Sequence, residues 1–110
     1  MIHKMRLVDF AFKKIKDGTK DIEVRLNDEK RQLININDII EFTNLDTGEI
    51  IITRVINLYK FDSFGKLFDS FNHSRLGLKS TDDESIMNIF YTLEEQKKYD
   101  ALGIQIELIR

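Results

Sequence analysis

The sequence contains no cysteine, which excludes disulfide bonds, thiolate metal sites and a cysteine nucleophile. Its only two histidines, His3 and His73, lie far apart and have no partner at helical spacing, so we predict no metal site and no cofactor. No stretch approaches the roughly 20 apolar residues of a membrane-spanning helix. Residues 1–6 also lack the apolar run of a signal peptide. We therefore expect a cytoplasmic protein without membrane contacts.

The sequence also lacks a large excess of either charge. Its 17 basic and 19 acidic residues give a formal net charge of -2, which excludes a polycation that coats nucleic acid indiscriminately. Residues 1–60 carry 11 basic and 10 acidic side chains, whereas residues 61–110 carry 6 and 9. Any contact with nucleic acid must therefore be local, and the N-terminal half is the more cationic part.

The length and composition fit one globular domain. A chain of 110 residues with 42% hydrophobic content is large enough for one core but not for two, so we expect a single domain over residues 1–110. There is no room for a separate catalytic module. The oligomeric state is left open.

Apolar alternation predicts the strands of this domain, at residues 3–8, 22–26, 39–43, 50–61 and 102–109. Turn signals at Asn37-Asp38 and at Asp46-Thr47-Gly48 separate the middle strands. With helices between the others, the order is strand, helix, strand, strand, strand, helices, strand, which is an α+β class. Arg54 lies amid the long apolar strand, where it either lines a cleft or reaches the strand edge.

Helix starts are predicted from their capping residues. Asp9 is a good N-cap for a short helix that Gly18 would end. Ser63 can cap a second helix with core spacing, so its aromatic cluster is interpreted as core rather than as a base-stacking platform (Phe64, Leu67, Phe68 and Phe71). Capping boxes at residues 81–84 and 92–95 predict two more helices. The first of these would bury four apolar residues (Ile86, Met87, Ile89 and Phe90). Residues 72–80 are expected to form an ordered loop. Its His73 and Arg75 either face the same cleft as the motif strand or serve solubility, and solubility is the preferred interpretation.

The most informative stretch is residues 18–25, Gly-Thr-Lys-Asp-Ile-Glu-Val-Arg. Its strand alternates, so Ile22 and Val24 are predicted on a buried face, and Glu23 and Arg25 on the opposite, solvated face. With Lys20 at the entrance to the strand, this arrangement could bind a polar, anionic ligand. The alternative is a surface ion pair worth less than about 1 kcal/mol. In both cases Glu23 contributes little to packing, so we expect Glu23→Gln to change stability by less than about 1 kcal/mol.

The motif Gly-x-Lys-x-x-Glu-x-Arg resembles the signature of the ASCH domain family, within the PUA-like superfamily. The similarity also covers residues 12–16 before the motif and residues 27–31, 37–42, 64–68, 90–92 and 102–104 after it. Two departures are visible: there is no proline near Phe10, and Asn37 stands where most members have glycine. Asparagine tolerates the left-handed backbone that such a turn needs. The resemblance implies a small PUA-like β-barrel of about five to six strands flanked by helices, with a cleft bordered by the motif strand.

The resemblance implies an RNA-binding or modified-nucleoside-binding module. In this interpretation, cationic side chains hold phosphate or ribose, and Glu23 accepts hydrogen bonds from a base edge. Tyr91 matches an aromatic position that is typical of the family, although its hydroxyl is expected to bond the backbone. The candidate ligand-binding residues are Gly18, Lys20, Glu23, Arg25, Lys30, Arg31, Arg54 and Tyr91.

A small hydrolase is the alternative. One bacterial branch of the ASCH group hydrolyses the acetyl amide of N4-acetylcytidine with the motif lysine as a catalytic residue, and ribonuclease activity has been proposed for others. Lys20 and Glu23 would then be catalytic. However, Glu23 stands where that branch has a hydroxyl residue, and residues 72–78 contain no acid. A neighbouring carboxylate also favours a charged ammonium over a nucleophilic amine, so binding is the preferred interpretation.

Overall fold

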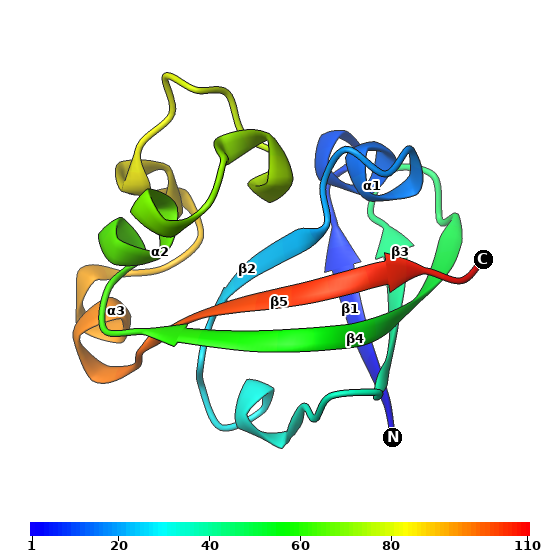
Figure 1. Cartoon of the computed structure of the whole chain (residues 1–110), viewed down its shortest axis with the longest axis horizontal. Helices are drawn as coiled ribbons and strands as arrows, with labels where there is room; N and C mark the ends of the chain where they lie inside the picture. The colour runs from blue at the N-terminus through cyan, green and yellow to red at the C-terminus, as the bar shows by residue number, and fades with distance from the viewer.

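One five-stranded sheet organises the chain, and the computed structural model describes all residues 1–110. The strand order is β1-β3-β4-β5-β2, with β1 parallel to β3 and every other neighbouring pair antiparallel. The sheet curls into a half-barrel whose two edge strands are β1 and β2 (Figure 1). The strands are β1 (Ile2–Leu7), β2 (Ile22–Leu26), β3 (Ile39–Asn44), β4 (Ile50–Phe61) and β5 (Ala101–Leu108).

Helices flank the half-barrel in two groups. The first is α1 (Asp9–Lys16), which connects β1 to β2. The second group lies between β4 and β5, and we call residues 62–100 the helical insert. It contains α2 (Phe64–Ser70), η2 (His73–Leu76), η3 (Glu84–Ile89) and α3 (Leu93–Lys98), and a further 3₁₀ turn, η1 (Arg31–Leu33), follows β2. Figure 1 shows α1 and the helical insert on either side of β2. No helix combines the length and apolar character needed to cross a membrane.

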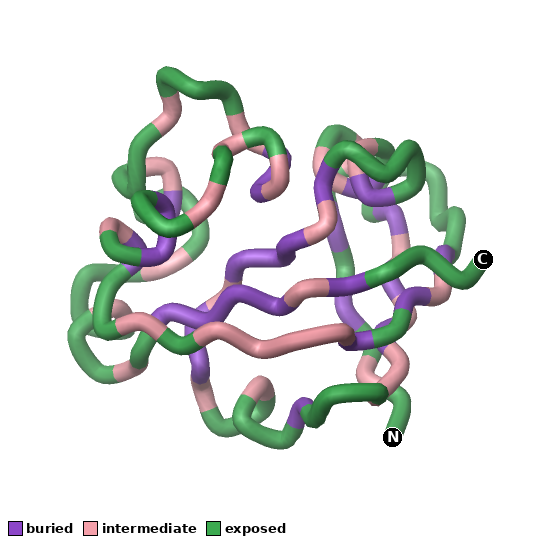
Figure 2. Tube along the Cα trace, viewed as in Figure 1, coloured by how far each residue is buried: buried purple, intermediate pink, exposed green.

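Two hydrophobic clusters hold this arrangement together. The larger fills the half-barrel beneath α1, where Phe12 and Ile15 meet Phe42 and Ile104. The smaller joins the helical insert to β2, and its members include Ile22, Leu26, Phe64, Leu67 and Phe68. Figure 2 shows β2 as buried along most of its length. The motif strand is therefore covered on both faces, unlike an ordinary edge strand of a solvated sheet.

The α+β half-barrel and most element positions are confirmed. The long strand has the predicted bounds, Ile50–Phe61. Asn37 adopts a left-handed backbone with φ of 75°, and Gly18 has φ of 87° directly after the helix C-cap. The hydroxyl of Ser63 accepts a hydrogen bond from the Lys66 backbone N–H, and a complete capping box starts α3 at Thr92.

Two predicted caps are wrong. Val8 is the N-cap of α1, and Asp9 is its first helical residue, because the Asp9 carboxylate accepts a hydrogen bond from Asn44 Nδ2 at 2.9 Å instead of capping the helix. The capping box predicted at residues 81–84 does not form. Asp83 is instead the N-cap of a 3₁₀ helix, η3.

The change of helix type alters which side chains are buried. A 3₁₀ helix has three residues per turn, so side chains four positions apart no longer share one face. Met87 is buried, Ile86 is partly buried, and Ile89 and Phe90 are 77% and 60% exposed. Leu108, which the alternation of the last strand places inward, is also 43% exposed, at the end of β5.

Candidate functional site

The motif forms a buried cluster of three charges. Glu23 is 4% exposed and Lys20 7% exposed. One oxygen of the Glu23 carboxylate lies 2.9 Å from Lys20 Nζ, and the other lies 2.6 Å from Arg25 Nε. The alternation of side chains along β2 was predicted correctly, but the prediction that Glu23 lies on a solvated face was wrong. The face that carries Glu23 is covered by other segments of the chain, so a surface ion pair is excluded.

Electrostatics keep Glu23 ionised inside the protein. Burial opposes ionisation, but the adjacent charges of Lys20 and Arg25 and their hydrogen bonds outweigh it, and the pKa of Glu23 falls to about 2. Burial likewise opposes the charge of Arg25, yet Glu23 raises the pKa of that guanidinium. The three groups therefore carry two positive charges and one negative charge.

Residues 73–79 of the helical insert are attached to the motif by hydrogen bonds to Lys20 and Asp21. Lys20 Nζ donates a hydrogen bond to the Leu76 carbonyl at 3.0 Å. Arg75 donates two hydrogen bonds of 3.0 Å to the Asp21 carboxylate, and the Asp21 N–H donates to the Arg75 carbonyl. Gly77 has φ of 77°, and a Cβ there would lie 2.7 Å from Lys20 Cδ. This loop is thus attached to the motif, and a glycine at position 77 makes room for the lysine stem.

A pocket of about 510 Å³ opens above the cluster. It lies on the open side of the half-barrel, where β1 and β2 face each other, and Arg25 Nη2 crosses this opening to donate a hydrogen bond to the Arg6 carbonyl at 3.0 Å. One wall comes from the end of β1 and from α1, and the other comes from the helical insert. The polar residues of the lining are Arg6, Lys20, Glu23, Arg25, Arg31, Lys79, Asp82 and Tyr91.

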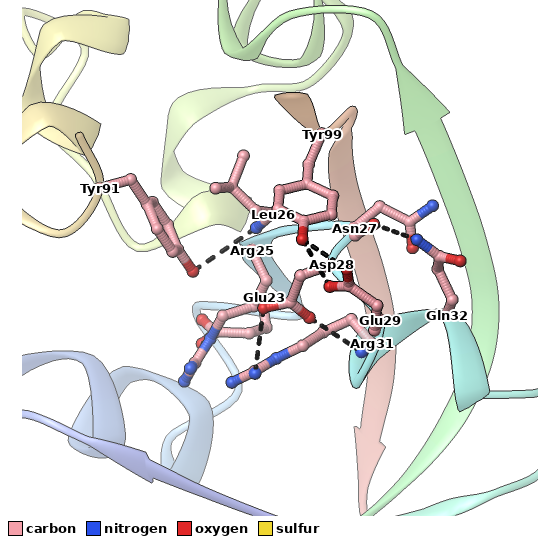
Figure 3. Close-up of polar contacts among 10 residues, drawn as sticks. All are labelled: Glu23, Arg25, Leu26, Asn27, Asp28, Glu29, Arg31, Gln32, Tyr91 and Tyr99. Carbon is pink, nitrogen blue, oxygen red and sulfur yellow. Dashed lines mark hydrogen bonds and ion pairs between the residues drawn. The ribbon is translucent and has the colours of Figure 1, made fainter. Parts of the chain in front are cut away.

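Five of the eight predicted ligand-binding residues line this pocket, namely Lys20, Glu23, Arg25, Arg31 and Tyr91. Figure 3 shows the guanidinium groups of Arg25 and Arg31 pointing the same way. Arg31 Nη1 lies 3.5 Å from an Asp28 oxygen, and its buried Nε has no hydrogen-bond partner.

Tyr91 approaches the backbone as predicted. The Leu26 N–H donates to the Tyr91 hydroxyl oxygen at 3.5 Å, which leaves the hydroxyl proton for another acceptor. Burial raises the pKa of Tyr91, so the hydroxyl stays protonated.

The other three predicted ligand-binding residues lie outside the pocket. Gly18 is exposed in the turn before the motif, where it supplies the left-handed backbone. Lys30 is exposed beside Arg31. Arg54 does not line the cleft. It lies within β4 and forms an ion pair with Glu107, the residue paired with it on the neighbouring strand β5.

The two loop residues that were expected to serve solubility have structural partners instead. His73 packs against Phe68 with ring centroids 5.7 Å apart, and Arg75 binds Asp21. Neither lines the pocket. No group of three or more histidine, aspartate or glutamate side chains is placed to hold a metal ion.

The pocket residues that sequence reasoning did not indicate include two further cations, Arg6 and Lys79, and two exposed aromatic residues, Phe10 and Phe90. Phe10 is 56% exposed in α1, and its helical position beside the buried Phe12 gave no distinguishing signal. The lining contains five cations and two carboxylates, Glu23 and Asp82, which is a local charge of +3 in a chain of net charge -2. The pocket therefore combines a cationic floor with apolar walls.

The fold and this site define a class: an α+β half-barrel of the PUA-like type with a charged motif strand beneath a pocket. The ASCH domain family model matches residues 5–110, and the chain belongs to that family.

Solved structures support the assignment. The hypothetical protein PH0355 is 31% identical, with a TM-score of 0.86 over 99% of this chain and 100% of that one. PF0455 from Pyrococcus furiosus is 29% identical, with a TM-score of 0.78 over 100% and 99% of the two chains. A mutant of ZmASCH from Zymomonas mobilis shares the fold at 14% identity, with a TM-score of 0.72 over 99% and 71%. No curated protein matches the chain.

Proposed function

We propose that the pocket binds RNA or a modified nucleoside. The observation that carries the proposal is the combination of apolar and aromatic walls with a net positive lining in a pocket of about 510 Å³. That volume falls in the range of about 300–1,000 Å³ of ordinary small-ligand sites. A planar base suits the walls, and phosphate or other acceptor atoms suit the cations.

The contacts suggest a division of roles among the cations. Lys20 and Arg25 already bind Glu23, and each also donates to a backbone carbonyl, of Leu76 and Arg6 respectively. They keep donors for one acceptor-bearing edge of a base, since an ammonium has three protons and a guanidinium five. Phosphate contacts are assigned to the side chains of Arg6, Arg31 and Lys79, which have no carboxylate partner as close as Glu23.

A matched pair of variants tests this assignment. Arg31 lines the pocket, whereas its neighbour Lys30 is exposed outside it, so Arg31→Ala and Lys30→Ala remove the same charge from adjacent positions. We expect Arg31→Ala to weaken binding of short single-stranded RNA by about 1–2 kcal/mol and Lys30→Ala to leave it nearly unchanged. Fluorescence anisotropy of a labelled oligonucleotide measures both. Equal losses of RNA affinity in the two variants would show that RNA contacts the protein surface outside the pocket, and would contradict the proposal.

A second candidate function is hydrolysis of an acylated nucleoside. The observation that favours it is the burial of the motif lysine, Lys20, at the floor of the pocket, where its side chain is 7% exposed. Incubating the wild-type protein with N4-acetylcytidine and measuring released acetate separates the two functions. Calorimetric binding of that nucleoside without acetate release would identify a binding module, and release that saturates with substrate would identify a hydrolase. Ribonuclease activity is tested in the same way, by cleavage of the labelled oligonucleotide.

A further inference from the structure

Two phenylalanine rings stand exposed on the walls of the pocket. Phe10 is 56% exposed and Phe90 60% exposed, and both belong to the lining. They come from α1 and from the end of η3, the elements on either side of β2 (Figure 1). Exposed apolar rings that line a cavity are more informative than single rings scattered over a surface, because they mark interaction sites.

Neither ring is needed for the core. Phe10 is absent from the cluster beneath α1, which Phe12 and Ile15 fill from the same helix. Phe90 is absent from the cluster of the helical insert, although its neighbours Met87 and Tyr91 belong to it or pack against it. Packing therefore gives no reason for phenylalanine at either position.

The Phe10 ring and the backbone at Phe90 nevertheless have fixed partners. The Lys14 ammonium lies 4.2 Å from the centre of the Phe10 ring and also 3.5 Å from the Gly77 carbonyl, so it connects α1 to the helical insert. This cation covers one face of Phe10 and leaves the ring more than half exposed. The backbone N–H of Phe90 donates to the Met87 carbonyl at 3.1 Å and fixes the end of η3. The Phe10 ring thus has a cation against one face, and the backbone that carries Phe90 is fixed, before any ligand binds.

We propose that Phe10 and Phe90 are the base-contacting residues, and that an unpaired RNA base inserts between the two walls and stacks on their rings. This inference rests on the proposed function. A base in a duplex is covered on both faces by its neighbours, whereas an unpaired base offers its faces to aromatic side chains. The pocket thus selects single-stranded over double-stranded RNA, with the flanking phosphate at the rim beside Arg6 and Arg31.

A protein interface is the competing explanation for Phe90. Ile89 and Leu93 are also exposed, by 77% and 64%, and with Phe90 they make an apolar patch at the start of α3. Neither of them lines the pocket, however, while Phe90 shares the pocket with Phe10 from a distant segment. The location of the two rings in one cavity favours a small planar group over a flat partner surface.

The test compares side chains that differ in aromaticity but not in apolar character. Phe90→Leu and Phe10→Leu remove stacking, Phe90→Tyr keeps it, and Ile89→Ala is the control beside Phe90 but outside the pocket. Dissociation constants are measured by fluorescence anisotropy with labelled eight-nucleotide single strands of each base and with a hairpin duplex. We expect each leucine variant to bind the preferred single strand at least about 5-fold more weakly, because stacking on one aromatic ring contributes about that much or more. Phe90→Tyr and Ile89→Ala should stay within about twofold of wild type, and the duplex should bind more weakly than the single strand.

The outcomes separate this inference from the proposed function. If both leucine variants bind single strands as tightly as wild type does, the stacking inference is wrong and the proposed RNA binding stands. Equal affinity for the hairpin duplex would do the same. If wild type binds neither RNA nor nucleosides, the proposed function and the stacking inference fail together. A self-associating wild type that both Ile89→Ala and Phe90→Leu convert to monomer, with RNA affinity unchanged, would assign Phe90 to a protein interface instead.

Discussion

At Glu23 a single carboxylate balances the buried ammonium of Lys20 at 2.9 Å and the partly buried guanidinium of Arg25 at 2.6 Å. Removing one partner of a buried ion pair leaves an uncompensated charge in a medium that solvates it poorly. The cluster is therefore a structural element of β2 as well as the floor of the pocket. Any variant of these three residues must be tested for stability before a change in binding is interpreted.

The first residue-scale prediction is that Glu23→Gln destabilises the protein. The glutamine keeps the shape but leaves Lys20 and Arg25 without a counter-charge, and we expect the free energy of unfolding to fall by about 3–5 kcal/mol. Chemical denaturation measures the change. Glu94→Gln is the control, because Glu94 is exposed and forms no ion pair, and it should be close to wild type. If the free energy of unfolding decreases by less than about 1 kcal/mol in Glu23→Gln, Glu23 behaves as a surface residue.

The second concerns pH. Because the pKa of Glu23 is about 2 in the folded protein and 4.5 ordinarily, its ionised form stabilises the fold above pH 4.5. That contribution is lost as the pH falls from 4.5 through about 2. The difference in stability between wild type and Glu23→Gln should therefore narrow over this window. Denaturation curves at pH 2.5, 3.5, 4.5 and 6 measure it, and a constant difference would show that Glu23 is not ionised in the folded state.

At the scale of elements, the helical insert and β2 are joined by residues 73–79. Arg75 binds Asp21, the Leu76 carbonyl binds Lys20, and the Gly77 carbonyl lies 3.5 Å from Lys14 Nζ. These contacts position the Lys20 ammonium and one wall of the pocket together. A disturbance of the loop should therefore reach the binding site through Lys20.

Gly77→Ala tests this connection against a matched control. Gly77 and Gly48 have nearly the same φ, 77° and 76°, but a Cβ at position 77 would contact Lys20, and one at position 48 would meet nothing within 4 Å. Both alanine variants bear the cost of a left-handed backbone, about 1–2 kcal/mol. Only Gly77→Ala should also weaken RNA binding, because it displaces the lysine stem. Thermal melts and anisotropy measure the two effects, and equal RNA affinities in the two variants would contradict the connection.

At the scale of the whole molecule, the charge of the pocket lining is opposite in sign to the net charge of the chain. The chain has a formal charge of -2, yet the pocket lining carries +3. Such a local concentration of positive charge attracts an anionic ligand to the pocket. The remaining surface, in contrast, does not bind nucleic acid indiscriminately. The salt dependence of binding should reveal how many of the cations meet phosphate.

We expect a shallow salt dependence. Three cations of the lining, Arg6, Arg31 and Lys79, are assigned to phosphate, and single strands lose about 0.7 in the logarithmic slope per neutralised phosphate. The slope of log affinity against log salt should thus be about -2. Titrations between 50 and 300 mM salt measure it. A slope steeper than about -4 would require contacts beyond the pocket, and a slope near zero would exclude phosphate binding.

The sequence by itself determined the elements and the family. Alternation located β2 and the bounds of β4, Ser63 and Thr92 marked two helix starts, and the motif around Lys20 and Glu23 indicated the ASCH domain. These features depend on contacts within a few residues, so they can be read locally. The same alternation also put Glu23 and Arg25 correctly on one face of the strand.

Only the tertiary structure decided what covers that face. Glu23 is buried because Leu76, Arg6 and Tyr91, all distant in sequence, surround the charge cluster. Arg54 carries the same charge as Arg31, but the sheet order places it beside Glu107 rather than in the pocket. The exposure of Phe10 and Phe90 likewise depends on how α1 and the helical insert border the opening between β1 and β2. Burial of a charge and the lining of a pocket are relations between remote segments, and local pattern carries no information about them.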